Sequence, residues 1–329
     1  MKRFLAFAAA AAVMLSTAAG AAGFDKAVIL GDSIASGYGL DGYVAGDNYS
    51  AAESFGNRLA ADCGECVNLA VDGRTTAQLL EALDTAEMSE AVSGADCVIV
   101  SIGGNDFLQP MLTAAQMAMF TNPDITNIIQ GGDTADIDLE AVSKQISQSV
   151  LQAAEAVDTA KSGKNISGIL TKIHALNPAA EVKLLTVYNP FEDVENFYFD
   201  ALNDNYAAVQ AFSYASIFGS LSDIAETKLA QLNYEIVNAA NSSGADIVDV
   251  YSAFKGHAEE YTNISYYDVH PNKDGHAVIY SLITEQAGSV QTSAPAKNIP
   301  STGAESAAAA IGAVLLASAA VIALRKKRA

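Results

Sequence analysis

Short apolar runs that alternate with longer amphipathic segments constrain the fold of this chain more than any other feature. Five runs of four to six residues are rich in apolar and β-branched residues, a pattern typical of strands buried on both faces of a sheet. They are residues 27–30, 67–70, 97–102, 182–187 and 247–250. Apolar residues recur at helical spacing over residues 51–61, 76–86, 139–160 and 223–241. The alternation predicts an α/β fold, a three-layer α/β/α sandwich around a parallel sheet of about five strands.

Residues 1–22 have the composition of a secretory signal peptide. Basic Lys2 and Arg3 precede an alanine-rich apolar run at residues 5–15, and the small residues at 19–21 form a cleavage pattern. The run is too short to span a bilayer comfortably, which disfavours a membrane anchor. We therefore expect export, with residues 23–288 forming the folded catalytic domain.

The C-terminal end carries a second targeting pattern. A linker rich in Ser, Thr, Pro and Ala at residues 289–298 precedes Ile-Pro-Ser-Thr-Gly at 299–303, an uncharged apolar stretch at 307–324 and a basic end at 325–329. The stretch is about long enough to span a bilayer. This arrangement resembles the sorting signal of Gram-positive surface proteins. There a sortase cleaves Leu-Pro-x-Thr-Gly between Thr and Gly and joins the Thr to peptidoglycan; here Ile299 replaces the leucine. A plain tail anchor is the alternative, and both interpretations place the protein at the cell surface.

The chain is strongly acidic. Its 38 Asp and Glu outnumber its 18 Lys and Arg, which gives a net charge of −20 at pH 7. The two ends carry six of the basic residues and one of the acids, which leaves about −25 on the central part. Such a charge argues against nucleic-acid and anionic-membrane partners, which basic patches attract. We expect a monomer that acts on a small-molecule or glycan ester, with a sortase and peptidoglycan as further partners.

The chain contains three cysteines. Cys63 and Cys66 are separated by two residues, and export permits a disulfide between them; two free thiols are the alternative. Cys97 lies in a strand-like run and is most simply a small buried apolar residue. Two thiols are too few ligands for zinc, and the four histidines are scattered, so no metal site is expected.

Four motifs follow predicted strands. The carboxyl ends of parallel strands meet at one edge of a sheet, where ligands bind, so the motifs are expected to converge there. The motifs are Gly-Asp-Ser at 31–33, Asp-Gly at 72–73, Gly-Gly-Asn-Asp at 103–106 and, after a loop, Asp-Val-His-Pro-Asn at 268–272. Ser33 stands in a glycine-rich turn that fixes its hydroxyl and lets a substrate approach the backbone. A serine hydroxyl is a weak nucleophile, so its value depends on a nearby base and oxyanion site.

Together these motifs resemble the four blocks of the SGNH hydrolases, also called GDSL esterases and lipases. The resemblance rests on the Gly-Asp-Ser, the glycine after the second strand, Gly-x-Asn-Asp, and His-Pro-Asn-x-x-Gly-His at 270–276. It spans about residues 26–283, and it implies a flavodoxin-like SGNH fold and an esterase or lipase activity without a cofactor. The serine motif lacks the second glycine of Gly-x-Ser-x-Gly, which argues against the sharp elbow of ordinary α/β-hydrolases.

The resemblance implies a role for each block. Ser33 corresponds to the nucleophile and His270 to the general base. The backbone N–H groups of Ser33 and Gly73 and the side-chain amide of Asn105 correspond to three oxyanion donors. Physical chemistry agrees, because a tetrahedral intermediate needs neutral donors fixed in advance, each worth about a hundred- to a thousandfold in rate. The base then passes its proton to the leaving alkoxide.

The acid of the triad departs from the family's pattern. The family usually has Asp three residues before the histidine, a position that Tyr267 occupies here, and Asp268 stands only two before. A carboxylate at this position reaches the ring Nδ1 of His270 only if the backbone bends. The alternative is a Ser–His dyad in which a main-chain carbonyl orients the imidazole. We favour Asp268.

Other polar residues beside these motifs are expected to be structural. Asp32 should brace the turn before Ser33, and Asp106 should hold the 103–105 loop by hydrogen bonds to its backbone. Structural roles are also expected for the turn residues Asn272 and Gly275, which lead into a helix near His276, and for His174, His257 and His276. Residues 189–221 are unusually aromatic. They form either a wall over an acyl pocket or, the simpler interpretation, helices packed on the core.

These observations predict a cell-surface serine esterase that hydrolyses carboxylic esters through an acyl-enzyme. A carbohydrate O-acetylesterase is an alternative with the same fold, and a catalytically idle binding module is an alternative from another class. Pocket depth separates the two enzymes, because a long acyl chain needs an apolar trough. The presence of Ser33, Gly73, Asn105 and His270 together argues against the idle module.

Overall fold

A five-stranded parallel sheet forms the centre of the molecule. The computed structural model describes residues 23–123, 139–192, 207–264 and 268–285. The sheet has the order β2-β1-β3-β4-β5, and every neighbouring pair is parallel. Its strands are β1 (Lys26–Gly31), β2 (Glu65–Asn68), β3 (Cys97–Ser101), β4 (Glu181–Leu185) and β5 (Asp246–Val248). All five predicted strands are confirmed, although β2 begins and ends two residues earlier than expected.

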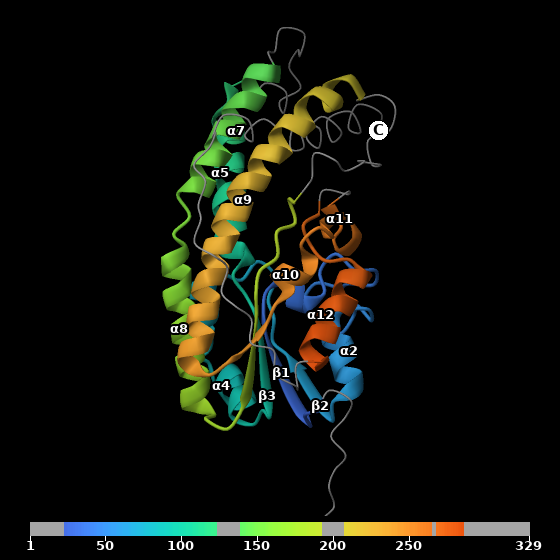
Figure 1. Ribbon diagram of the computed structural model, residues 1–329, viewed down its shortest axis with the longest axis vertical. Helices are drawn as coiled ribbons and strands as arrows, with labels where there is room; N and C mark the ends of the chain where they lie inside the picture. Colours follow the sequence, from blue (N-terminus) through green and yellow to red (C-terminus); the bar gives the residue numbers. More distant parts are fainter. Residues whose placement is uncertain (1–22, 124–138, 193–206, 265–267, 286–329) are drawn as a thin grey trace, which may run out of the picture.

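Helices cover both faces of this sheet, as Figure 1 shows. The helices that precede β4 in the sequence are α1 (Ser33–Ser36), α2 (Phe55–Asp62), α3 (Thr76–Ala82), α4 (Ala86–Ser93), α5 (Gly104–Thr121), α7 (Leu139–Glu155) and α8 (Thr159–Leu176). After β4 come α9 (Ala207–Ser243), α10 (Val250–Phe254), α11 (Ala258–Tyr261) and α12 (Lys273–Glu285). The predicted three-layer α/β/α sandwich is therefore confirmed.

Alternation along the strands divides the core into two parts. Val28 and Leu30 of β1 belong to a cluster that also contains buried residues of α3, α4, α5, α7, α8 and α9. Ala27 and Ile29 point to the opposite face, into a smaller cluster with buried residues of α2, α10 and α12. Successive strand side chains point to opposite faces, so a strand covered on both faces must be apolar throughout. This is why continuous apolar runs identified the strands.

Local capping sets the helix boundaries where the sequence prediction was imprecise. The segment predicted as one helix over 76–86 contains the end of one helix and the start of the next. Thr75 and Gln78 form a capping box at the start of α3, and Thr85 accepts a hydrogen bond from the Met88 N–H to begin α4. Similarly, the helix predicted from residue 51 begins only at α2, because Ser54 caps it.

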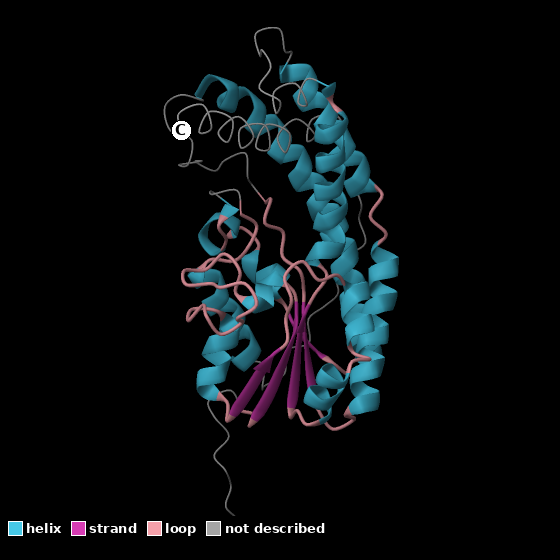
Figure 2. Cartoon of the chain, turned by 180° about the vertical axis from the view of Figure 1, so that it is seen from behind, coloured by secondary structure: helices cyan, strands magenta, loops and turns pink. Residues whose placement is uncertain are grey.

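The longer helices α5, α7 and α9 extend well beyond the sheet, as Figure 2 shows from behind. Within the ranges described above, no helix is both long and apolar enough to cross a membrane. The predicted signal peptide (1–22), linker (289–298), sorting motif (299–303), apolar stretch (307–324) and basic end (325–329) lie outside those ranges.

The strand order creates a crevice between β1 and β3. The chain leaves β1 toward β2 on one side, whereas β3, β4 and β5 follow on the other side. In open parallel sheets such a reversal opens a space at the carboxyl ends of the two strands, where ligands bind. Ser33 follows β1 and Asn105 follows β3, so both lie at this point.

Candidate active site

Ser33 is the first residue of the short helix α1, directly after β1. Its neighbour Asp32 caps this helix by accepting the Ile34 N–H at 3.0 Å. The preceding Gly31 leaves no room for a side chain, because an added Cβ would collide with the carbonyl oxygen of Ser101 on β3. The tight pairing of β1 with β3 and the cap together fix the Ser33 hydroxyl at the crevice.

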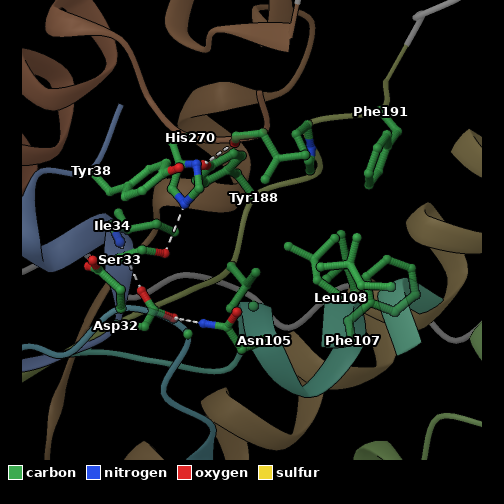
Figure 3. Close-up of a pocket in the computed structure, with 18 residues that line it drawn as sticks. Asp32, Ser33, Ile34, Tyr38, Asn105, Phe107, Leu108, Tyr188, Phe191 and His270 are labelled. Atoms are coloured by element: carbon green, nitrogen blue, oxygen red, sulfur yellow. Dashed lines mark hydrogen bonds between the residues drawn. The ribbon is translucent and has the colours of Figure 1, made fainter. Parts of the chain in front are cut away.

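His270 and Asp268 meet Ser33 across this edge of the sheet. The His270 Nε2 lies 2.8 Å from the Ser33 Oγ (Figure 3). The Asp268 Oδ1 is hydrogen-bonded to the His270 Nδ1. The same carboxylate oxygen accepts the backbone N–H of His270 at 3.1 Å. The backbone therefore bends so that a carboxylate two residues before the histidine contacts its ring. The structure brings the three residues into one continuous chain of hydrogen bonds.

The surroundings of Asp268 favour its charged form. Partial burial by itself raises the pKa of this carboxyl group, but the hydrogen bonds and charge of His270 act in the opposite direction. A further hydrogen bond from the side chain of Asn263 acts in the same direction, and the pKa of Asp268 is lowered overall. An ionised carboxylate is the form that accepts a hydrogen bond from the ring Nδ1–H of a histidine.

Gly73 and Asn105 both line the cavity beside Ser33. Gly73 has φ of +72°, a conformation that glycine adopts without strain, and its carbonyl oxygen accepts a hydrogen bond from the Gln109 side chain. The Asn105 Nδ2 donates to the Asp32 Oδ2 at 3.3 Å and to the carbonyl oxygen of Arg74 at 3.2 Å. The structure thus places both residues at the site, with the amide of Asn105 held by two long hydrogen bonds.

Asp32 is buried beneath the serine, with 1% of its surface exposed. Burial raises the pKa of this carboxyl group to about 7, although the Ile34 N–H, the charge of His270 and the Asn105 amide all act to lower it. Its contacts with Ile34 and Asn105 connect the turn after β1 to the start of α5. The expected bracing role of Asp32 agrees with these contacts.

Asp106 has different partners from those expected. Its carboxylate accepts the backbone N–H of Thr76 at 2.8 Å, the Thr76 hydroxyl at 2.6 Å and the Ser162 hydroxyl at 3.1 Å. The group therefore ties α5 to α3 and α8, and the prediction that it holds the backbone of the 103–105 loop was wrong. Asp106 already belongs to the first turn of α5, and its side chain projects from that helix toward Thr76 and Ser162.

The remaining histidines lie outside this hydrogen-bonded chain. His276 is fully buried, its Nδ1 accepts the Phe55 N–H at 3.2 Å, and burial lowers its pKa to about 3. Exposed His257 contacts Glu260 at 2.9 Å, and His174 lies in the last turn of α8. Asn272 caps α12 by accepting the N–H groups of residues 274 and 275, as the predicted turn required. These positions agree with structural roles.

Cys63 and Cys66 are both free thiols in the structure, so the disulfide that the sequence permitted is not formed. Cys63 ends α2 and Cys66 lies in β2, where its Sγ contacts the carbonyl oxygen of Gly56 at 4.0 Å. Burial raises the pKa of Cys63 to about 11 and that of Cys66 to about 12. Cys97 is fully buried in β3, as expected of a small apolar residue.

An apolar cavity of about 260 Å³ opens beside the serine. Its walls come from α5, from the segment after β4 and from α9. The apolar side chains that line it are Ile34, Phe107, Leu108, Leu112, Val187, Pro190, Phe191, Leu229 and Val269. Figure 3 shows Phe107, Leu108 and Phe191 on the side away from Tyr38. Of the predicted aromatic segment, Phe191 lines the cavity, and residues 193–206 lie outside the described ranges.

Tyr38 is a further site residue that the motifs did not reveal. Its ring lies 4.5 Å from the His270 ring, centroid to centroid, and 5.2 Å from the ring of Tyr43. The Tyr43 hydroxyl donates to the carboxylate of Asp72, which also accepts the Ser36 hydroxyl at 2.6 Å. Tyr38 follows Gly37, which ends α1 in the left-handed conformation. This glycine-rich turn is the feature of the sequence that could have indicated Tyr38 as a site residue.

Comparisons with known proteins agree with this architecture. A model of the GDSL-like Lipase/Acylhydrolase family matches residues 29–278, and the chain belongs to this family. The spore germination lipase LipC of Bacillus licheniformis is 23% identical over 254 residues, which cover 75% of this chain and 89% of that protein. The crystal structure of phospholipase A1 from Streptomyces albidoflavus NA297 is similar at a TM-score of 0.51 and 18% identity, over 80% of this chain and 100% of that one. The likeness to that structure shows the fold, and family membership identifies a serine hydrolase that acts on ester bonds.

The site is built from nucleophilic and hydrogen-bonding groups. Among the described residues, no group of three or more His, Cys, Asp and Glu side chains is arranged to hold a metal ion. The groups that are present can transfer a proton between oxygen and nitrogen and can donate hydrogen bonds to a developing anion.

Proposed function

We propose that this protein is a cell-surface esterase that cleaves carboxylic esters through an acyl-enzyme on Ser33. The single observation that carries the proposal is the 2.8 Å contact between the Ser33 Oγ and the His270 Nε2 at the mouth of an apolar cavity. A hydroxyl in hydrogen-bond contact with a histidine that is itself bound to a carboxylate can be activated as a nucleophile.

The reaction proceeds in two halves. The Ser33 oxygen attacks the carbonyl carbon of the ester while its proton passes to the His270 Nε2, and the carbonyl oxygen becomes an anion. As the intermediate collapses, the bond to the alcohol oxygen breaks, and His270 returns its proton to that oxygen. A water molecule then attacks the acyl-enzyme with His270 again as base, which releases the acid and restores the Ser33 hydroxyl.

Asp268 keeps the imidazole in the required tautomer. Its carboxylate accepts the Nδ1–H of His270, so the unprotonated Nε2 faces Ser33. The negative charge also stabilises the imidazolium that forms when Nε2 takes up the proton. We therefore assign a triad to this chain in preference to a Ser–His dyad.

The backbone N–H groups of Ser33 and Gly73 and the side chain of Asn105 stabilise the anion. The contacts of the Asn105 amide to Asp32 and Arg74, at 3.3 and 3.2 Å, are longer than the usual N–H···O distance. A negatively charged oxygen is the stronger acceptor, so the amide turns one hydrogen toward the intermediate.

The cavity defines the acyl side of the substrate. The leaving oxygen must lie near the His270 Nε2, whose ring is covered by Tyr38, so the acyl group extends the other way, toward Leu108 and Phe191. The cavity of about 260 Å³ offers far more apolar space than the single methyl group of an acetyl ester needs. This favours medium-chain acyl esters over acetyl esters.

A series of p-nitrophenyl esters from acetate to palmitate tests this assignment. We expect the highest kcat/KM near the octanoate, and we expect Ser33→Ala to abolish turnover while Ser93→Ala, at an exposed serine of α4, retains it. Leu112→Trp should shift the optimum to shorter chains, whereas Met117→Trp on an exposed position of the same helix should not. Activity on acetate alone would indicate an acetylesterase, and no Ser33-dependent turnover on any ester would indicate a binding module.

The location at the cell surface is supported by the sequence of the two ends. The signal-peptide pattern at 1–22 provides export, and the motif at 299–303 with the apolar and basic segments behind it provides attachment to peptidoglycan by a sortase. Incubation of the exported protein with a sortase and a glycine nucleophile should release the residues after Thr302. Retention of the full mass would instead support a membrane tail anchor.

A further inference from the structure

The acid of this site stands one position closer to the histidine in the sequence than is usual in the family. The loop that carries it must therefore bend to bring the Asp268 carboxylate to the His270 ring. Asn263, at the start of this loop, pairs with both ends of the segment 268–270. Its backbone N–H donates to the carbonyl oxygen of His270 at 2.9 Å, and its carbonyl oxygen accepts the N–H of Asp268 at 3.2 Å. This pairing bends the segment so that the Asp268 carboxylate turns back on the His270 ring.

The side chain of Asn263 continues the same arrangement. Its Nδ2 donates to the carbonyl oxygen of Gly39 at 3.2 Å, and its amide acts to lower the pKa of the Asp268 carboxyl group. Gly39 makes room for these groups. A Cβ at Gly39 would lie 2.8 Å from the Asp268 Oδ2, 3.2 Å from the Asn263 Nδ2 and 3.2 Å from the His270 Cβ.

The two oxygens of the Asp268 carboxylate have different neighbours. Oδ1 accepts the ring Nδ1–H and the backbone N–H of His270. Oδ2 lies beside Gly39, where the Nδ2 of Asn263 is also a neighbour. A carboxylate with one oxygen unheld can rotate about its last bond and exchange its histidine contact for water, and the Asn263 amide opposes this rotation.

We propose that Asn263 is a positioning residue that holds the Asp268 carboxylate against the Nδ1 of His270. The inference rests on the proposed function of Ser33, His270 and Asp268, and it adds a fourth residue to that site. Asn263 does not line the cavity beside Ser33, so its side chain acts on the reaction through Asp268. The lowered pKa of Asp268, to which the Asn263 hydrogen bond contributes, agrees with this arrangement.

A double-mutant cycle with p-nitrophenyl octanoate tests the proposal. A hydrogen bond to a charged group is worth about a tenfold effect or more, so Asn263→Ala should lower kcat by at least tenfold with KM changed by less than about twofold. In the Asp268→Asn background the same substitution should change kcat by less than about twofold, because the group through which it acts is already lost. Asn263→Ser, which is polar but too short to reach the carboxylate, should behave like Asn263→Ala and serves where the alanine variant does not fold.

Asn272→Ala provides the matched control. Asn272 belongs to the same loop and donates to the carbonyl oxygens of Glu260 and Thr262, but it has no contact with the Asp268 carboxylate. Its effect on kcat should be the same in the wild-type and Asp268→Asn backgrounds. Thermal unfolding of each variant shows whether its loss of kcat is accompanied by a loss of stability.

The outcomes separate this proposal from the proposed function. If wild type is active and Ser33→Ala is inactive, but Asn263→Ala and Asn263→Ser keep full kcat, Asn263 has no positioning role and the inference is overturned. Equal losses from Asn263→Ala with and without Asp268 also overturn it, because the effect would then be general to the loop. Ester turnover that does not depend on Ser33 would remove the proposed function and the inference with it.

Discussion

Two carboxyl groups lie on opposite sides of the Ser33–His270 pair, and their surroundings change their pKa values in opposite directions. Asp32, in the turn after β1, has the N–H of Ile34 and the Asn105 amide as partners, and burial raises its pKa to about 7. Asp268, in the loop before α12, is partly buried as well, which also raises its pKa. Its contacts with His270 and the Asn263 amide together outweigh that effect, and its pKa falls below the ordinary value.

The difference shows that burial alone does not decide the role of an acid at this site. Asp268 has two N–H donors from His270 and a third from Asn263, so its charge is compensated directly. Asp32 has only one backbone donor and one long contact from a neutral amide. Its charge is compensated less than that of Asp268, so burial favours its protonated form. A carboxylate that stays charged suits the orientation of an imidazole, and a buried acid suits the bracing of a turn.

Replacing each of the two acids by its amide should give the largest difference in kcat. Asp268→Asn should lower kcat by roughly 10⁴-fold, because an amide neither fixes the reactive tautomer nor stabilises the imidazolium. His270→Ala removes the base itself and should cost roughly 10⁶-fold. Asp32→Asn keeps an oxygen that can accept the Ile34 N–H, and kcat should stay within about tenfold of wild type.

Steady-state kinetics on one medium-chain ester compare the three variants directly. Equal losses for Asp268→Asn and His270→Ala would mean that the aspartate is as indispensable as the base. A loss for Asp32→Asn as large as that for Asp268→Asn would contradict the separation of roles between the two acids.

The raised pKa of Asp32 makes a prediction about stability and pH. Between the ordinary value of 3.8 and about 7, the unfolded chain loses the proton that the folded protein keeps. The contribution of this group to the free energy of unfolding therefore falls as pH rises through that window, by up to about 1.4 kcal/mol per pH unit and on the order of 4 kcal/mol in all. Asp32→Asn removes this term, so its stability relative to wild type should rise from pH 4 to pH 7.

Urea unfolding at several pH values measures this difference. Asp41→Asn, at an exposed position, is the control and should run parallel to wild type. A constant difference between wild type and Asp32→Asn across pH 4 to 7 would mean that the two states of the chain bind the Asp32 proton equally.

Gly39→Ala should have a smaller effect, directed at the loop of Asp268. Gly39 has φ of +87° and Gly46 has φ of +83°. Alanine at either position should therefore cause the same backbone strain, about 1 kcal/mol. Only at Gly39 does the new Cβ meet Asp268, at 2.8 Å, whereas nothing lies within 4 Å at Gly46. Gly39→Ala should lower kcat about tenfold through displacement of Asp268 or His270.

Thermal unfolding and kinetics of both alanine variants separate strain from displacement. Similar losses of stability with a loss of kcat only for Gly39→Ala would support the packing of Asp268 against Gly39. An unchanged kcat for Gly39→Ala would show that the loop adjusts without moving its acid.

Sequence patterns predicted the convergence of the site because each motif follows a strand. Strand identity came from continuous apolar runs, and parallel strands bring their carboxyl ends to one edge, so Ser33, Asn105 and His270 could be placed together. The bent contact of Asp268 with its own histidine could not be derived in this way. It depends on Asn263 and Gly39, and Gly39 is more than two hundred residues away in the chain.

The cavity was also beyond prediction, for a related reason. Leu108 and Leu229 belong to helices that form separately and meet only when α5 and α9 pack on the sheet. Local spacing predicts that such residues are apolar, but it does not tell which of them line a cavity. Asp106 was misplaced because its partners, Thr76 and Ser162, come from two other helices.

Covalent labelling tests the central claim, that Ser33 is the nucleophile, most directly. The protein is treated with a fluorophosphonate that carries a medium alkyl chain, and the modified peptide is identified by mass spectrometry. We predict one adduct, on Ser33, which is absent from Ser33→Ala and strongly slowed in His270→Ala. An adduct on another residue, or an unlabelled wild type that still hydrolyses esters, would contradict the account.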